Sequence, residues 1–386
     1  MKIALLTDGL DPYVMGGMQR HSAMLTQYLP KQGVELSVFH TAHNANAIGK
    51  ARDWENSLST SNVKVYPTFV DYPTRGQFPG HYLRDSRAYS RRLLATYLQA
   101  GSDHDFIYAK GLTGGAFIES KRAGIQLPPV GINAHGYEMF QRAPSLRVKA
   151  EHLLLRSSFK KISQQADYVF SYGAKISHIL LERIKVMPEK IIEVPTGIDP
   201  SWLTQDKICA VPQTRRFVFV GRYERRKGIE ELCQVLGRWK GPPIKFVFIG
   251  PVPRSRQLAL PWISYRGALS EKFEIQNILD RSDVLVCPSY SEGMPNVIME
   301  AMARRLAIIA TDVGATSKIC GSENGILIPK ITVSSLRYAL EEIAVLPEDK
   351  LQNMKKRSLN KVASYTWDRV AHSTANVIRR AIDGKG

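Results

Sequence analysis

Two glutamates, Glu292 and Glu300, are the residues of this chain whose type and spacing first suggest chemistry. Seven residues separate them, and the stretch leads from a short apolar run, typical of a strand buried on both faces, into a helix that Asn296 can cap. Glu300 falls about one helical turn into that helix, and one turn rises roughly 5.4 Å. Such a pair can bind two hydroxyl-bearing parts of one elongated ligand while the helix start binds a phosphate between them, which is the shape of a sugar nucleotide. The bare spacing also fits two ordinary surface glutamates.

The residues around this pair resemble those of a known family. The sequence SEGMPNVIMEAMA, residues 291–303, resembles the glutamate-seven-glutamate motif of the retaining glycosyltransferases of family 4, also called glycosyl transferases group 1, which have the GT-B fold. The chain departs from the family pattern at residues 304–306, Arg-Arg-Leu, where a glycine is usual. We expect an altered turn there and not the loss of the site.

The resemblance implies an α/β protein of the GT-B fold, with two Rossmann-like doubly wound domains facing a central cleft. It implies that Glu292 orients the donor sugar and that Glu300 holds the ribose of a nucleotide sugar. The residues that it implies for donor binding between the two glutamates are Gly293, Met294, Pro295, Asn296 and Val297.

A basic loop follows the first expected strand of the second half, at residues 221–228. Arg222 and Lys227 stand five residues apart on this loop, and an arginine and a lysine so placed can clamp a diphosphate from two sides. Their spacing matches the phosphate-binding pair of the family, whereas Arg225 and Arg226 are expected to be solvated. Fixed cations here would stabilise the charge that a departing nucleoside diphosphate gains, without a metal.

The first half of the chain contributes two further candidate segments. Gly16 and Gly17 follow the first expected strand, where glycines let backbone N–H groups approach an anion, and they resemble the family's glycine loop near the donor phosphates and the acceptor. His135 follows a buried strand, at the edge where doubly wound sheets bind ligands. The family has a histidine at the corresponding place, which hydrogen-bonds the donor sugar. Tyr137 and Glu138 are candidates for reaching the acceptor.

Two strand ends in the second half complete the expected site. Residues 266–269 end a strand that in the family presents backbone groups to the nucleobase, which places Leu269 beside the donor. Asp312 begins a loop that matches the family's next strand end, although an ordinary turn is an equal interpretation. Since no Asp-x-Asp pattern stands in a suitable loop, we expect no required metal, no metal ligands and no cofactor beyond the nucleotide-sugar co-substrate.

The composition narrows the class of protein. A chain of 386 residues with 44% hydrophobic and 23% charged residues is typical of a soluble protein with two α/β domains. The net charge of +18 suggests an anionic partner, but the excess is spread over both halves, which argues against a nucleic-acid partner. No C-x-x-C pair occurs, so Cys209, Cys233, Cys287 and Cys320 are expected to be reduced and packed. No apolar run is long enough to span a membrane, and the first residues predict a strand and no signal peptide.

Strand and helix patterns alternate along the chain, which predicts parallel sheets with helices on both faces. We expect an acceptor-side domain over residues 1–198, a linker over 199–214, a nucleotide-sugar domain over 215–365, and a final helix over 366–386 that, in the family, crosses back to the first domain. The strands are expected at 2–7, 35–40, 63–66, 105–109, 130–134, 168–171, 190–194, 216–221, 244–250, 262–266, 283–287, 306–310 and 325–328. The longest helices are expected at 18–32, 80–100, 144–165 and 367–382.

Residues 142–161 hold six basic residues against a single acid, with apolar residues among them. One interpretation is a basic amphipathic helix that rests on anionic lipid, which would suit a lipid-linked acceptor. The other is a helix whose apolar stripe lies in the core and whose basic face is solvated, and we favour this second interpretation.

The resemblance implies a retaining glycosyltransferase, which we expect to act in the cytoplasm, with peripheral contact at the inner face of the cytoplasmic membrane as an alternative. The donor is a nucleoside-diphosphate sugar, a UDP-sugar before GDP-mannose. The acceptor is a glycan, a lipid-linked molecule or a small molecule, in bacterial cell-surface polysaccharide or glycolipid synthesis. The resemblance implies that the catalytic residues are Glu292, His135, Arg222 and Lys227. A sugar-nucleotide epimerase of the same fold is the first alternative, and an NAD-dependent oxidoreductase, whose glycine fingerprint is missing, is the second.

Overall fold

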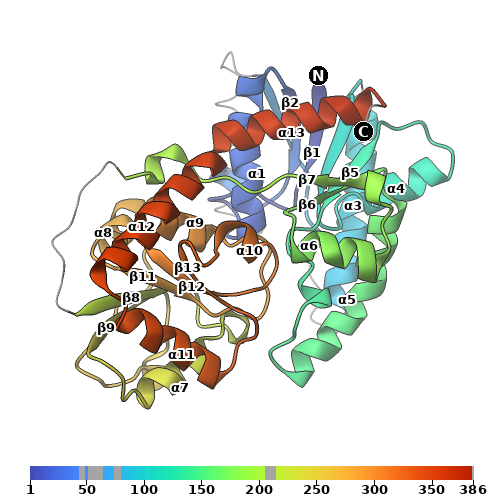
Figure 1. Ribbon diagram of the computed structural model, residues 1–386. Helices are drawn as coiled ribbons and strands as arrows, with labels where there is room; N and C mark the ends of the chain where they lie inside the picture. Colours follow the sequence, from blue (N-terminus) through green and yellow to red (C-terminus); the bar gives the residue numbers. More distant parts are fainter. Residues whose placement is uncertain (43–47, 51–63, 74–79, 102, 205–213, 385–386) are drawn as a thin grey trace.

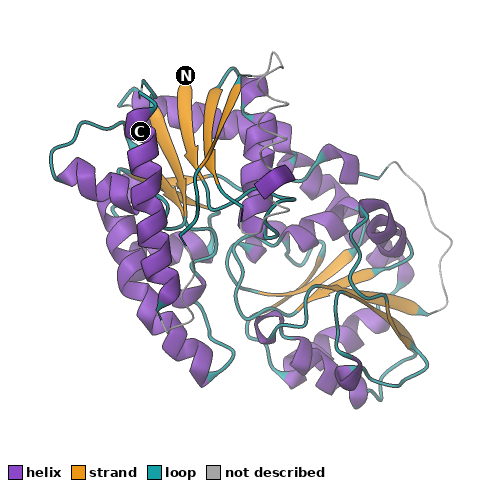
Figure 2. Ribbon diagram, turned by 180° about the vertical axis from the view of Figure 1, so that it is seen from behind, coloured by secondary structure: helices purple, strands orange, loops and turns teal. Residues whose placement is uncertain are grey.

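The computed structural model describes residues 1–42, 48–50, 64–73, 80–101, 103–204 and 214–384. They form two lobes, each built on one parallel sheet with helices on both faces (Figure 1). In the view from behind, the two sheets stand apart, each enclosed by its own helices (Figure 2). The expected linker lies mostly at 205–213, outside the described residues.

The N-terminal lobe has a seven-stranded sheet of order β3-β2-β1-β4-β5-β6-β7. The chain runs outward from β1 to β3 and restarts at β4 on the other side of β1, which creates the switch point at which doubly wound sheets bind ligands. The strands are β1 Lys2–Leu6, β2 Glu35–His40, β3 Val65–Phe69, β4 Phe106–Lys110, β5 Val130–Asn133, β6 Tyr168–Ser171 and β7 Ile191–Glu193. The helices of this lobe include α1 Gly17–Tyr28, α3 His81–Gln99, α4 Gly115–Arg122, α5 Leu146–Gln165 and α6 Lys175–His178.

The C-terminal lobe repeats the plan with six strands in the order β10-β9-β8-β11-β12-β13. Its strands are β8 Arg215–Val220, β9 Ile244–Ile249, β10 Ile263–Tyr265, β11 Val284–Cys287, β12 Ala307–Thr311 and β13 Gly325–Ile328. Its helices are α7 Ile229–Gly237, α8 Lys272–Asp280, α9 Asn296–Ala303, α10 Thr316–Ile319, α11 Val333–Ala344 and α12 Glu348–Val362. Every residue of β11 and β12 is buried, because parallel strands are covered on both faces.

The last helix, α13 Trp367–Ile382, lies on the N-terminal lobe (Figure 1). It follows α12 of the other lobe, and its apolar face, including Trp367 and Ile378, packs in one core with β1 and α1. At the crossing, the Ile198 N–H donates to the Tyr365 carbonyl (2.8 Å) and the Trp367 N–H to the Ile198 carbonyl (3.0 Å). The two segments in which the chain passes between the lobes, near residue 198 and near residue 366, are therefore hydrogen-bonded to each other.

Three details differ from the sequence-based expectation or extend it. The third strand was expected to end at residue 66, but β3 continues through Pro67 to Phe69, because an edge strand tolerates a residue without an N–H. Helix α5 begins at Leu146, with Ser145 as its cap. The described cysteines are free: Cys287 and Cys320 are buried and Cys233 is partly buried.

The favoured interpretation of residues 142–161 is wrong for the first half of α5. Its apolar stripe does not lie in the core: Leu146 is 84% exposed, Leu153 54% and Leu154 59%. The buried side chains of the helix, Phe159, Ile162 and Ser163, all belong to its second half. Within the described part of the chain, no helix has the length and apolarity that a membrane span requires.

Candidate active site between the two lobes

A cavity of about 670 Å³ lies between the lobes, at the carboxyl ends of strands from both sheets. The N-terminal lobe lines it with Met15, Gly16, Gly17, Met18, Tyr82, Gly111, Ala134, His135, Glu138, Met139, Leu155, Phe159, Tyr172 and Thr196. The C-terminal lobe lines it with Val220, Gly221, Arg222, Arg226, Lys227, Glu292, Gly293, Met294, Pro295, Asn296 and Val297. Most of the sequence-predicted site residues are therefore brought together here.

Glu292 is held by cations in the wall of this cavity. The Lys227 ammonium donates to its carboxylate at 2.7 Å, and the Ser289 hydroxyl donates to the same oxygen at 2.7 Å. Burial by itself would raise the pKa of Glu292, but the positive charges of Lys227 and Arg226 and these hydrogen bonds outweigh it and lower the pKa. Glu292 is thus an ionised, oriented acceptor.

The basic loop differs from the expectation in two of its arginines. Arg225 and Arg226 are not solvated: Arg225 forms a bidentate pair with the buried Glu231, and Arg226 donates to the Ser291 carbonyl at 3.0 Å and approaches Glu292 at 3.5 Å. Arg222, in contrast, is largely exposed, with Glu224 at 3.0 Å. The Arg226 side chain therefore adds a third cation to the predicted pair.

A glycine allows this loop to approach the neighbouring strand end. Gly228 adopts a left-handed backbone, with φ of 66°, and a Cβ at this position would lie 1.9 Å from the Pro288 carbonyl oxygen. Only a residue without a side chain permits this approach. The close packing keeps Lys227 beside the loop that carries Glu292.

Two helix starts open into the cavity. Pro295, and not Asn296 as expected, is the N-cap of α9, and neither α9 nor α1, whose N-cap is Gly16, has a side-chain cap. Asn296 and Val297 begin α9 and line the cavity, as do Gly17 and Met18 of α1. Their N–H groups have no partner within the helix, so both helix ends favour an anion.

His135 lines the cavity from the N-terminal lobe, whereas Lys227 and Arg226 line it from the C-terminal lobe. Its Nδ1 is 2.5 Å from the Tyr172 hydroxyl, and its Nε2 is buried without a hydrogen-bond partner among the described residues. Burial lowers the pKa of His135 well below its ordinary value, so the ring is neutral. If Tyr172 donates to Nδ1, the proton of the ring stands on Nε2, ready to donate to a hydroxyl.

A second buried polar contact, between Lys110 and His21, lies next to His135. Lys110 ends β4 and is fully buried, with its Nζ 2.7 Å from Nδ1 of His21 on α1. Burial holds the pKa of Lys110 well below its ordinary value. The ring of His21 meets His135 edge-on, with centroids 5.0 Å apart. Lys110 thus fixes the ring of His21, and that ring packs against His135.

Glu300 does not line the cavity. It is 7% exposed, and Arg20 of α1 reaches across from the other lobe to place its Nη1 2.6 Å from Oε1 of Glu300. The expected ribose carboxylate is therefore also half of an ion pair between the lobes.

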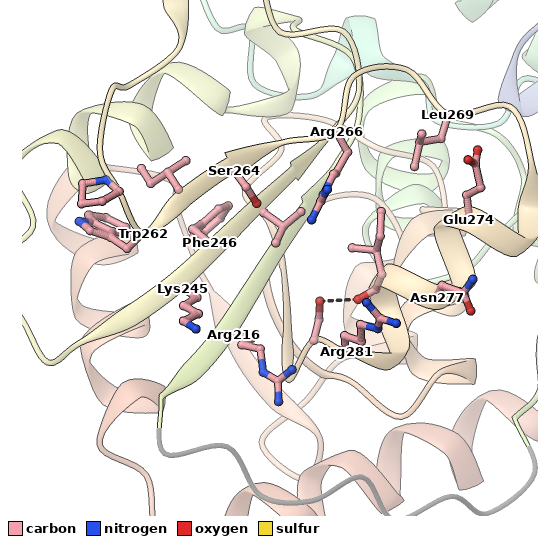
Figure 3. A pocket seen from close by; sticks show the side chains of 15 residues that line it. Arg216, Lys245, Phe246, Trp262, Ser264, Arg266, Leu269, Glu274, Asn277 and Arg281 are labelled. Carbon is pink, nitrogen blue, oxygen red and sulfur yellow. Dashed lines mark hydrogen bonds between the residues drawn. The ribbon is translucent and has the colours of Figure 1, made fainter.

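Of three other predicted site residues, Glu138 lines the cavity, whereas Tyr137 and Leu269 do not. The Tyr137 side chain is fully buried and contacts the Ser163 hydroxyl at 2.9 Å, so the expectation that it reaches an acceptor is wrong for this geometry. Glu138 lines the cavity, and burial raises its pKa. Leu269 lies in another hollow of the C-terminal lobe (Figure 3).

That hollow has a volume of about 710 Å³ and lies on the face of β8, β9 and β10 beside α8 (Figure 3). Four of its lining residues, Arg216, Lys245, Arg266 and Arg281, are basic, and one, Glu274, is acidic. It contains neither glutamate of the motif nor the glycine loop at Gly16 and Gly17. The expected donor position of Leu269 is therefore not part of the cavity between the lobes.

Further contacts join the lobes around the cavity. Gln141 donates to the Glu292 carbonyl at 2.6 Å, and Lys175 lies 2.8 Å from the Asp312 carboxylate. Gly314, with φ of 55°, could not carry a Cβ, which would lie 2.2 Å from the Glu292 carbonyl oxygen. The loop at Asp312 thus supports the Glu292 loop and is more than a turn.

The sequence reasoning missed Arg20, Lys110, Tyr172 and Arg226. Lys110 carried a usable signal, because a charged residue that ends a buried strand faces the ligand-binding edge. The others carried none, since each acts through a partner far along the chain. Among the described residues, no three His, Cys, Asp or Glu side chains are grouped as a metal site would require.

Two family models match the chain, one for each lobe. The model described as Glycosyltransferase Family 4 matches residues 15–202, and the model described as Glycosyl transferases group 1 matches residues 214–344. The first match spans the glycine loop and His135, and the second spans the basic loop and both glutamates.

Curated relatives match part of the chain. TuaC of Bacillus subtilis, named for a proposed glycosyltransferase role in teichuronic acid biosynthesis, is 33% identical over 193 residues, which are 47% of this chain and 48% of TuaC. WcaL of Salmonella typhimurium, named in the same way for colanic acid biosynthesis, is 26% identical over 49% of this chain and 51% of WcaL. The matched part thus spans about half the length of these relatives.

Solved structures share the fold over nearly their whole length. Sucrose-phosphate synthase of Thermosynechococcus elongatus superposes with a TM-score of 0.78 at 18% identity, covering 99% of both chains. HepE of Anabaena, solved with UDP and glucose, superposes with a TM-score of 0.67 at 15% identity, covering 98% of this chain and 99% of HepE. The expected GT-B fold, with two Rossmann-like domains, is confirmed.

Proposed function

The chain belongs to the glycosyltransferases that join a family 4 domain to a group 1 domain, and on this premise we propose that it transfers a sugar from a nucleoside-diphosphate sugar to an acceptor hydroxyl, with retention of the anomeric configuration. One observation carries the proposal. The cations of the basic loop and two uncapped helix starts meet in a single cavity between the lobes. This arrangement suits a diphosphate.

In the proposed reaction, the bond between the anomeric carbon and the diphosphate oxygen breaks while the acceptor oxygen bonds to the same face of that carbon. The departing phosphate oxygen takes the proton of the acceptor hydroxyl. Lys227, Arg222 and Arg226 stabilise the charge that develops on the leaving group. Glu292 accepts hydrogen bonds from the sugar, and His135 donates one from Nε2.

The C-terminal lobe is the proposed donor side. Displacement of Glu292 by a phosphate would free the Lys227 ammonium, which now lies 2.7 Å from that carboxylate. Glu300 is the proposed ribose ligand, with Arg20 fixing its orientation. We propose that the reaction requires no metal, because Lys227, Arg222 and Arg226 line the cavity at the position proposed for the phosphates.

The N-terminal lobe is the proposed acceptor side. Its wall combines Glu138 with apolar side chains, among them Met15, Leu155 and Phe159. A wall of this kind suits an acceptor with both hydroxyl groups and an apolar part, such as a lipid-linked glycan. The names of the curated relatives support cell-surface polysaccharide synthesis as the setting.

The donor is tested by measuring thermal unfolding with UDP, GDP, ADP and CDP in turn. UDP is expected to raise the unfolding temperature most, since two solved neighbours carry UDP or a UDP-sugar. At a hundredfold excess over Kd, the stabilisation is about 2.7 kcal/mol. The same panel on Lys227→Ala is the control, and it should show a much smaller shift. If no diphosphate stabilises the wild-type protein, the donor proposal is wrong.

An epimerase is distinguished from a transferase by incubating the protein with the sugar nucleotide that it binds, in the absence of any acceptor. A transferase should leave it nearly intact over the time in which a lipid-linked or glycan acceptor is glycosylated. Rapid conversion to an epimer and free nucleotide would contradict the transfer reaction.

A further inference from the structure

The first half of α5 carries an apolar stripe that faces away from its own lobe. Leu146, Ala150, Leu153 and Leu154 follow the spacing i, i+4, i+7 and i+8, which places them on one side of a helix. The three leucines are 84%, 54% and 59% exposed. The helix extends beyond the other helices of its lobe in both views (Figures 1 and 2). No described residue covers this stripe.

Basic residues border the stripe on both sides. At 100° per residue, Lys149 and Lys160 fall on one border and Arg147 on the other, while Lys161 falls in line with the stripe about two turns beyond Leu154. Lys149 and Lys160 are exposed and form no ion pair with any residue that the structure describes, while Arg147 pairs with Glu151 at 3.2 Å and Lys161 pairs with Glu119 at 3.1 Å. An apolar centre between two cationic borders matches the boundary of an anionic bilayer, where acyl chains lie beneath negative head groups.

The opposite side of the same helix belongs to the cavity. Leu155 and Phe159 line the proposed acceptor wall and lie roughly half a helical turn around from the stripe. An α-helix with its side chains is about 10 Å across. A bilayer that touched the stripe would therefore lie about one helix diameter from the acceptor wall.

We propose that the outward stripe of α5, formed by Leu146, Leu153 and Leu154 with its border lysines, docks the protein on an anionic lipid bilayer. This inference deepens the proposed function, because it brings the acceptor wall to the surface where a lipid-linked acceptor would lie. It is tested by vesicle binding and not by activity. Vesicle binding can therefore fail while the proposed transfer reaction holds, and the transfer reaction can fail while vesicle binding holds.

The test compares co-sedimentation of the full chain with vesicles of phosphatidylcholine alone and with equimolar phosphatidylcholine and phosphatidylglycerol. The wild type should bind the anionic vesicles and lose binding as salt rises. Leu146→Ser, Leu153→Ser and Leu154→Ser together should weaken partitioning on the order of 100-fold, and Lys149→Gln with Lys160→Gln by roughly 25-fold. Equal binding to both kinds of vesicle, or no binding to either, would overturn the proposal.

The chain offers a matched control for the leucine variant. Phe273, Tyr338 and Val345 are 66–70% exposed on the other lobe, and changing all three to serine should leave vesicle binding unchanged. If this control loses as much binding as the stripe variant, general surface hydrophobicity and not the stripe is responsible, and the proposal fails.

A second measurement reads the position of the stripe directly and does not depend on the multiple variants. In Leu153→Trp, the fluorescence added by the new indole should shift to the blue with anionic vesicles, whereas in Val345→Trp it should not. Sedimentation velocity without lipid tests whether a second copy of the chain, and not a bilayer, binds the stripe. If the wild type forms a dimer that the leucine variant abolishes, the stripe is an interface between copies, and the bilayer proposal is wrong.

Discussion

The two walls of the cavity differ in how they use charge. The C-terminal wall is ionic, with Lys227 and Arg226 around an ionised Glu292 and with Arg222 exposed at its rim. The N-terminal wall is the more neutral one: burial lowers the pKa of His135 and raises the pKa of the Glu138 carboxyl, and the other contributions are mainly tyrosine hydroxyls and apolar side chains. The same doubly wound plan therefore presents a site for an anion on one side and a site for neutral hydroxyl groups on the other.

The difference follows from what each wall exposes to the cavity. On the ionic side, charged residues of one short loop meet the uncapped start of α9. On the neutral side, single residues arrive from the ends of several strands, and burial disfavours the charged forms of His135 and Glu138. A transfer reaction needs both properties, because the leaving group gains charge while the acceptor enters as a neutral alcohol. The predictions below test this division, from the largest expected effect to the smallest.

The largest effect is expected on the ionic wall. Lys227→Ala should lower turnover by about 100- to 1000-fold, because a fixed cation at the leaving group acts mainly in the transition state. Steady-state kinetics with the donor that binds best measures it. Lys245→Ala is the matched control, since this lysine lines the other hollow of the same lobe, and its turnover should stay near that of the wild type. Equal effects of the two changes would contradict the placement of the diphosphate.

The contact between the walls should affect stability. Arg20→Met removes the partner of the buried Glu300 carboxylate and should lower the free energy of unfolding by about 2 kcal/mol, which is less than for a fully buried pair because Arg20 is 36% exposed. Denaturant unfolding measures it. Lys175→Met breaks a more exposed contact between the lobes and should cost less than about 1 kcal/mol. The reverse order would mean that the buried ion pair does not join the lobes.

A smaller effect is expected on the neutral wall. His135→Ala should lower kcat/KM about tenfold, and Tyr172→Phe about two- to tenfold, because each change removes one hydrogen bond or its orientation. Since burial lowers the pKa of His135, the ring stays neutral as the pH falls from 8 to 6. The pH profile of the wild type should therefore lack a step near pH 6.5. A step at that pH that disappears in His135→Ala would show that the histidine is charged during turnover.

The smallest effect is expected from removal of metal. Treatment with EDTA followed by gel filtration should leave turnover within about twofold of the untreated enzyme, because the ionic wall already supplies cations to the diphosphate. Magnesium added back to the treated enzyme is the control. A loss of activity that magnesium restores would mean that the ionic wall is incomplete without a metal.

Much of the fold could be predicted from the sequence, because its signals are local. Buried parallel strands are continuous apolar runs, so the strand at 325–328 and the helix at 367–382 match β13 and α13 to the residue. The residues of the ionic wall could also be predicted, since the basic loop and the motif around Glu292 are each contiguous in the chain. Tyr137 was misplaced, because the direction in which a side chain points after a strand depends on loop geometry that no local pattern records, and Leu269 lines the other hollow of the C-terminal lobe.

The sequence by itself thus determined the alternation of strands and helices, the cations and the glutamates of the ionic wall, and the position of a histidine at a strand end. The tertiary structure decided which of these groups are partners. Arg20 and Glu300 are 280 residues apart along the chain, and Tyr172 meets His135 only because β5 and β6 are neighbours in the sheet. The tertiary structure also turned the leucines of α5 outward. Burial and long-range contact set charge and orientation, and both arise only when the chain is folded.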